Sequence, residues 1–345
     1  MQAYAAMDPR LPLAAVPAYA RRIEQLGFDG LHVPETIHDS LAVALLALEH
    51  TTRLTVRTAV TLAFVRSPTL VAYTAWDLST MSGGRFELGL GTQIKQNIEG
   101  RFGVPWSEPR SRMAEYLAAL DALFTAFRDG GPLHYEGDHY RLTRMQPYFN
   151  PGPSATRTPP VWLGAVNAGM CELAGRMAHG VITHSTNADP DYLRAVVLPA
   201  LDRGATDAGR PTRPMLLASP PIAMGANDDS VRQERERQRR MLAFLYSTPS
   251  YAPTLGRRGW TELPEQLRVM IRAQRWADLP GLITDAMLDE LVICGRYEQL
   301  PALLTERYSA VADGVVLPPL GEGHDDRLLQ KCVTALRRTP TENET

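Results

Sequence analysis

Residues 82–93 read SGGRFELGLGTQ, and this stretch decides the fold prediction for the whole chain. Gly83-Gly84 predicts a tight turn, because glycine adopts positive φ angles without steric cost. Phe86 to Leu90 predicts a short buried strand, and Gly91-Thr92-Gln93 follows its end. Ligands of parallel α/β proteins bind beyond the carboxyl ends of the strands. The stretch therefore predicts either a purely structural turn and strand or one edge of a binding site.

Strand and helix patterns alternate on both sides of this stretch, at intervals of roughly 25 to 30 residues. The predicted strands occupy residues 2–6, 31–33, 54–62, 86–90, 161–164, 180–183, 215–224 and 313–317. The predicted helices between them occupy residues 17–26, 41–50, 67–81, 110–127, 169–177 and 190–206. Such alternation indicates parallel βαβ units of the α/β class. The number of units favours a closed (β/α)8 TIM barrel over an open doubly wound sheet.

Two segments, at about residues 130–160 and 245–291, interrupt the alternation. The first is rich in proline and predicts a hairpin with strands at residues 133–135 and 139–141. Charges of both signs alternate over residues 231–240, which is typical of a solvated helical face. No linker divides the chain. We therefore expect a single barrel domain over residues 1–345, with the two segments as insertions at the carboxyl ends of the strands.

Composition and charge exclude several functional classes. Lys plus Arg number 36 and Asp plus Glu 38, so the net charge of −2 gives no reason to expect nucleic-acid binding. No apolar run approaches the roughly 20 residues of a membrane span, and the N-terminus lacks a secretion signal. The three cysteines lie far apart, which predicts a reduced, cytoplasmic protein. No carboxylate–histidine cluster has metal-ligand spacing, so no metal is expected. No serine-hydrolase motif is present either.

Several segments, taken together and in order, resemble the bacterial luciferase-like flavin-dependent oxidoreductases. These segments are GFDGL (27–31), RSP (66–68), SGGRF (82–86), GLGT (89–92), PVWLGA (160–165) and AGRMAHG (174–180). Two further segments, FGVPWS (102–107) and YFNPGP (148–153), are similar to the subgroup that uses the deazaflavin coenzyme F420 instead of FMN. The resemblance spans most of the chain and implies a (β/α)8 barrel with the coenzyme ring at its carboxyl-terminal end. It also implies that the irregular segment after residue 130 folds over the substrate.

The resemblance also assigns coenzyme-binding residues. It implies a cis peptide bond between Ala59 and Val60, at a bulge in the third strand that supports the coenzyme ring. It implies a phosphate-binding loop before a helix, although Val166 and Asn167 replace the usual glycines there. Backbone N–H groups at a helix start bind phosphate whatever side chains they carry. The complete predicted set is Ala59, Val60, Thr61, Gly91, Thr92, Ala165, Val166, Asn167, His184 and Ser185.

Three side chains are candidates for catalysis. Glu35 follows the second strand, where a carboxylate in an apolar pocket can acquire a useful pKa. His38 is a candidate proton donor, although the neighbouring Asp39-Ser40 pair is also a typical helix cap. Gln93 is able to orient a polar substrate. The sugar-phosphate dehydrogenases of this group have Asp-His at the positions of Glu35-Thr36. They also have Thr-Gly-Glu, with a catalytic Glu, where this chain has Thr92-Gln93-Ile94. Sugar-phosphate oxidation is therefore not expected.

The sequence thus predicts an enzyme that transfers a hydride between F420 and a small organic substrate. One alternative is an FMN-dependent monooxygenase that receives reduced flavin from a partner reductase. A second alternative is a flavin- or deazaflavin-binding protein without turnover, because the catalytic acid and the loop glycines of relatives are missing. Relatives often form homodimers, and an apolar helix over residues 41–48 is compatible with such pairing.

Overall fold

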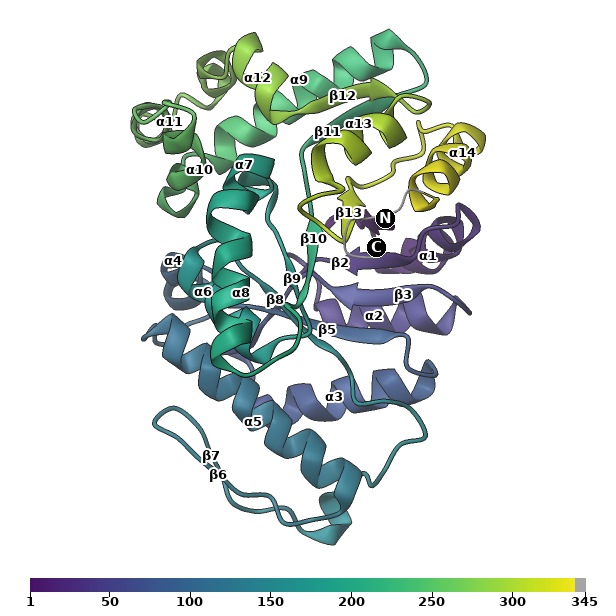
Figure 1. Ribbon diagram of the computed structural model, residues 1–345, viewed down its shortest axis with the longest axis vertical. Coiled ribbons are helices and arrows are strands. Elements are labelled where there is room, and N and C mark those ends of the chain that lie inside the picture. The colour runs from purple at the N-terminus through teal and green to yellow at the C-terminus, as the bar shows by residue number, and fades with distance from the viewer. Residues whose placement is uncertain (339–345) are drawn as a thin grey trace.

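The computed structural model describes residues 1–338, and a closed barrel of parallel strands lies at its centre (Figure 1). The barrel strands are β1 (Gln2–Ala6), β2 (Gly30–Val33), β3 (Thr55–Thr58), β4 (Thr61–Leu62), β5 (Phe86–Gly91), β8 (Val161–Gly164), β9 (Gly180–Ile182), β10 (Met215–Ala218) and β13 (Gly314–Leu317). β1 pairs with both β2 and β13, and β5 pairs with both β3 and β8, so the sheet has no free edge. β3 and β4 follow one another at one position of this nine-stranded sheet, which leaves eight barrel positions among the described residues. The (β/α)8 prediction is confirmed.

Helices surround the barrel and bury their apolar faces against it. They are α1 (Val16–Gln25), α2 (Ser40–Glu49), α3 (Pro68–Met81), α5 (Pro109–Asp129), α6 (Ala168–Met177), α7 (Pro190–Tyr192), α8 (Leu198–Asp207), α13 (Leu300–Tyr308) and α14 (Asp326–Arg337). Their starts follow the expected capping rules. Asp39 accepts hydrogen bonds from the first N–H groups of α2, and Ser67 caps α3 with Pro68 at its first position. None of the helices within residues 1–338 has the length and apolarity that crossing a bilayer requires.

Two predicted strands are each broken in the structure. The strand expected at residues 54–62 is divided into β3 and β4 by the Ala59–Val60 bond, which is cis as the resemblance implied. The strand expected at residues 215–224 is a wrong prediction: β10 belongs to the barrel, whereas β11 (Ile222–Gly225) pairs with β12 (Ile293–Arg296) in a separate sheet. Pro220 and Pro221 stand between β10 and β11, and they have no N–H group to continue a ladder.

The two insertions lie at opposite ends of the molecule (Figure 1). The first forms the predicted hairpin, β6 (Tyr135–Glu136) and β7 (Arg141–Leu142), beside α5, where Glu115 accepts the His139 N–H at 2.8 Å. The second packs around its own core, formed by residues such as Leu242, Leu267 and Leu288. Its helices are α10 (Ala252–Arg257), α11 (Leu263–Arg272) and α12 (Asp285–Leu291), and the preceding helix α9 (Asp228–Leu245) contributes Leu242 to the same core.

A charged cluster is buried inside the barrel, at positions that the sequence analysis did not single out. The Arg57 guanidinium donates to Glu87 at 2.7 Å and to His32 Nε2 at 2.9 Å. The same group lies 3.5 Å from the centre of the Trp162 ring and 4.6 Å from that of Tyr4. Burial, together with the adjacent Arg57 charge, holds the pKa of His32 well below its usual range. His32 is therefore neutral, and Arg57 and Glu87 compensate each other's charge.

Candidate active site

A cavity of about 370 Å³ opens at the carboxyl ends of the barrel strands, which we call the barrel mouth. It lies where the sequence predicts a ligand site, and most of the predicted site residues line it. The predicted residues in its lining are Glu35, Ala59, Val60, Gly91, Thr92, Gln93, Ala165, Val166, Asn167 and His184. Strand ends and loops that are far apart in the sequence therefore converge on one cavity.

Val60 forms the floor of the cavity, and two glycines make room for it. A Cβ atom added to Gly91 would lie 2.4 Å from a Val60 methyl group. One added to Gly164 would lie 3.0 Å from the other methyl group. The contact at Gly91 is shorter than carbon atoms tolerate, so a larger residue there displaces Val60, whereas one at Gly164 requires only a small shift of Val60. The glycines thus serve close packing around the floor, which is a tertiary role.

The end of β5 is fixed by its own side chains. Gln93 has a φ of 60°, in the left-handed region that non-glycine residues seldom adopt. Its side-chain oxygen accepts the Ile94 N–H at 3.0 Å, and the Thr92 hydroxyl donates to the Gln93 carbonyl at 3.1 Å. These bonds hold the Gln93 amide at the cavity wall, where the sequence predicts contact with the substrate.

The predicted phosphate-binding loop forms the wall beside α6. Asn167 caps α6, because its side-chain oxygen accepts the Met170 N–H at 3.0 Å. Asn187 donates to the Ala165 carbonyl at 3.1 Å, and the Tyr192 hydroxyl donates to the Val166 carbonyl at 2.8 Å. Asn187 and Tyr192 therefore hold the loop through its backbone carbonyl groups. The N-terminus of α6 lies at the cavity. A helix N-terminus carries partial positive charge and favours anions.

His184 closes the cavity next to this loop. Its Nδ1 accepts the Thr186 N–H at 3.4 Å and lies 2.8 Å from the Thr186 hydroxyl. Burial lowers the pKa of His184 to about 4, so the imidazole is neutral at pH 7. Because Nδ1 accepts, the proton of the neutral ring resides on Nε2. Two other predicted coenzyme residues are not in the lining: Ser185 begins the turn after His184, and the buried Thr61 hydroxyl lies 2.8 Å from Ser40 Oγ.

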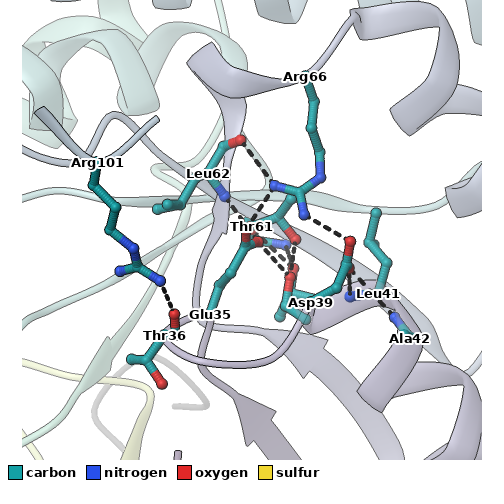
Figure 2. A network of polar contacts seen from close by, with 12 residues as sticks. Glu35, Thr36, Asp39, Leu41, Ala42, Thr61, Leu62, Arg66 and Arg101 are labelled. Carbon is teal, nitrogen blue, oxygen red and sulfur yellow. Dashed lines mark hydrogen bonds and ion pairs between the residues drawn. The ribbon is translucent and has the colours of Figure 1, made fainter. Parts of the chain in front are cut away.

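Glu35 is held in a network of polar contacts at the barrel mouth (Figure 2). Arg66 donates to one carboxylate oxygen at 2.6 Å. The Ser40 hydroxyl and the Leu62 N–H donate to the other, at 2.9 and 3.2 Å. Arg66 also donates to Asp39 at 2.8 Å. Glu35 thus connects the loop after β2 to the segment that follows the Val60 floor, and three donors occupy its carboxylate.

Some residues that the sequence predicts at the barrel mouth do not line the cavity. His38 is half-buried in the loop before α2 and does not belong to the cavity lining. No residue of the 130–160 segment lines the cavity, which contradicts the implied cover over the substrate. Ser250 and Tyr251, from the other insertion, line it instead. No motif marked this pair in the sequence. Over residues 1–338, no group of three or more His, Cys, Asp or Glu side chains is placed to hold a metal ion.

Comparison with known proteins is consistent with this architecture. The family model of luciferase-like monooxygenases matches residues 2–314. The chain belongs to this family. An uncharacterized protein of Mycobacterium tuberculosis is 37% identical over 313 residues, which cover 90% of this chain and 92% of that protein.

Other members carry more informative names. An F420-dependent glucose-6-phosphate dehydrogenase of Nakamurella multipartita is 31% identical over 183 residues, covering 53% of this chain and 51% of the relative. The solved structure of a coenzyme F420 dependent tetrahydromethanopterin reductase from Methanopyrus kandleri matches with a TM-score of 0.77 at 20% identity. That match covers 98% of both chains. The structural likeness extends over the whole barrel and shows a shared fold.

Proposed function

We propose that this protein transfers a hydride between coenzyme F420 and a small organic substrate. The observation that carries the proposal is one cavity lined by the apolar Val60 and by the N-terminal start of α6. A tricyclic ring with a phosphate-bearing side chain has matching parts. Leu62, Met170 and Ile182 add apolar surface, and polar side chains such as Gln93, Asn167 and His184 share the lining. The F420-dependent relatives favour this coenzyme over FMN.

In this proposal the residues of the chain bind the coenzyme and orient the substrate. When bound, the deazaflavin ring supplies the hydride chemistry. Ala59 and Val60 support the ring, Gly91 and Thr92 border it, and the start of α6 binds the phosphate. His184 donates its Nε2–H at the edge of the ring. Gln93 orients the substrate, and Glu35 holds the floor in place through the three donors that its carboxylate accepts, so that proton transfer is not its role.

Titration with each coenzyme tests the proposal. We expect F420 to bind with micromolar or tighter affinity, FMN to bind at least ten-fold more weakly, and the deazaflavin absorbance to bleach with a substrate found by screening alcohols. Gln93→Ala should raise KM for that substrate while leaving the affinity for F420 within two-fold. Tight binding of FMN with O₂-dependent product formation would overturn the proposal in favour of a monooxygenase.

A further inference from the structure

Tyr251 is the one large side chain that the second insertion places in the cavity lining. It ends a short helical turn (Pro249–Tyr251) before α10, far in sequence from every barrel strand. Its ring is stacked on the ring of His184, with 4.7 Å between the ring centres and 6° between the planes. Both rings border the same cavity, and His184 is a residue that the proposed function assigns to the coenzyme. This contact is therefore a physical link between the insertion and the coenzyme site.

The insertion is tied to the barrel beside this stack. Arg258, at the end of α10, donates to Asp189 at 3.0 Å and also pairs with Glu290. Asp189 in turn caps α7 by accepting N–H groups of Asp191 and Tyr192, each at 3.0 Å. Asp189 follows His184 by only a few residues, so the same short segment carries both the stacked ring and the ionic anchor. The insertion is held at two neighbouring points.

The stack fixes the orientation of the His184 ring plane, which the hydrogen bonds to Thr186 alone leave free to vary. The bonds to Thr186 direct Nδ1 of His184 toward its own turn, but a ring can still rock about such bonds. A second ring packed parallel to the imidazole opposes this motion, and stacked aromatic pairs contribute about 0.5 to 1.5 kcal/mol beyond burial. The remaining Nε2–H then has a single direction. Tyr251 also covers His184 from water, which agrees with the lowered pKa of the imidazole.

We propose that Tyr251 is a positioning residue: its ring fixes the plane of the His184 imidazole, so that the helical insertion completes the coenzyme pocket. The inference rests on the proposed function, because His184 is taken to contact the coenzyme. It assigns the 245–291 insertion a part in binding the coenzyme. The phenol hydroxyl is not needed for this role, whereas the aromatic ring is.

Three substitutions test the inference on the full-length chain, with coenzyme F420 as the probe. Tyr251→Phe keeps the ring and should bind F420 within two-fold of the wild type. Tyr251→Leu and Tyr251→Ala remove the ring and should weaken F420 binding at least ten-fold. Tyr148→Ala is the matched control, because Tyr148 is 91% exposed and lies outside the lining. Circular dichroism shows whether each variant is folded, and the leucine variant retains apolar bulk if the alanine variant does not fold.

Nitrogen-15 NMR of the histidine side chains adds a readout that needs neither coenzyme nor substrate. Tyr251→Leu should raise the pKa of His184 toward 6.5 and produce a mixture of tautomers, whereas Tyr251→Phe should leave the Nε2–H form intact. A wild type that does not bind F420 would overturn the proposed function. Wild-type binding that Tyr251→Leu shares unchanged, with an unchanged His184 signal, would overturn this inference alone.

Discussion

Arg57 and Arg66 lie close together in the chain, on either side of the Ala59–Val60 floor, and both pair with carboxylates. Arg57 points into the barrel, where its side chain is 1% exposed and Glu87 is 10% exposed. Arg66 lies at the barrel mouth, 19% exposed, between Glu35 and Asp39. A buried charge depends on its partner because water cannot replace that partner. A partly exposed charge loses much less stabilisation when its partner is removed, because water solvates it.

The comparison separates the fold from the site. The Arg57 cluster has contacts from β1, β2, β5 and β8, so its loss affects the barrel as a whole. The Arg66 network joins only the loop after β2 to the segment after Val60, so its loss affects the cavity floor. We therefore expect variants at Arg57 to change stability and variants around Arg66 to change coenzyme binding.

Arg57→Ala should lower the free energy of unfolding by about 3 to 5 kcal/mol, because Glu87 would lose its buried countercharge and keep only the exposed Arg157, 3.4 Å away. Thermal and urea unfolding followed by circular dichroism measure this loss. The double variant Arg57→Leu/Glu87→Leu removes both charges and should recover most of the stability. If Arg57→Ala and the wild type had the same free energy of unfolding, the interior cluster would not stabilise the fold.

Acidification should destabilise the surroundings of the two buried histidines while sparing the pair between Arg66 and Asp39. The pKa values of His32 and His184 are both below the usual 6.5. The folded state therefore binds fewer protons than the unfolded chain, and stability is lost as the pH falls below 6.5. The loss should approach about 1.4 kcal/mol per pH unit for each histidine.

The mouth network behaves differently over the same range of pH. Burial raises the pKa of Asp39, but hydrogen bonds from Arg66 outweigh it and bring that pKa below its usual value. Its pair with Arg66 thus persists between pH 7 and pH 5. Urea unfolding at stepwise pH measures the effect, and His32→Gln should flatten the profile, while the exposed His134→Gln should not. A profile without slope between pH 7 and pH 5 would contradict the prediction.

Glu35→Gln should weaken F420 binding about ten-fold, or about 1.4 kcal/mol. The amide keeps the shape of the side chain but removes the charge opposite Arg66, which loosens the segment after Val60. The free energy of unfolding should change by less than about 1 kcal/mol, since Arg66 is partly solvated. If Glu35 moves a proton instead, Glu35→Gln would bind F420 normally and lose only turnover, which fluorescence titration and steady-state kinetics distinguish.

Asp39→Asn should have the smallest effect, and it is the matched control for Glu35→Gln. Asparagine caps a helix as well as aspartate does, and the Asp39 side chain is 51% exposed. Both F420 affinity and unfolding should stay within about 0.5 kcal/mol of wild type. A larger loss of affinity than in Glu35→Gln would mean that Asp39, and not Glu35, organises the cavity floor.

Local patterns predicted most of the barrel, because each strand and helix has its own periodicity and its own caps. The same patterns placed Gln93 just past the end of β5, whereas the cis Ala59–Val60 bond was implied only by the resemblance to a known family. The pairing of β11 with β12 was missed because it joins Ile222 to Ile293 across the whole second insertion. The Arg57 cluster was missed for the same reason, since its members come from separate strands and form no motif.

The residue order by itself determined the eightfold alternation, the Gly83-Gly84 turn before β5 and the polar strand ends at the barrel mouth. These features depend on local conformation and on the spacing of apolar residues. Only the tertiary structure decided that Tyr251 from the second insertion reaches the cavity and that the hairpin does not. It also decided that Arg66 holds Glu35. Contacts between distant segments depend on how whole elements pack, and no short stretch of sequence encodes that packing.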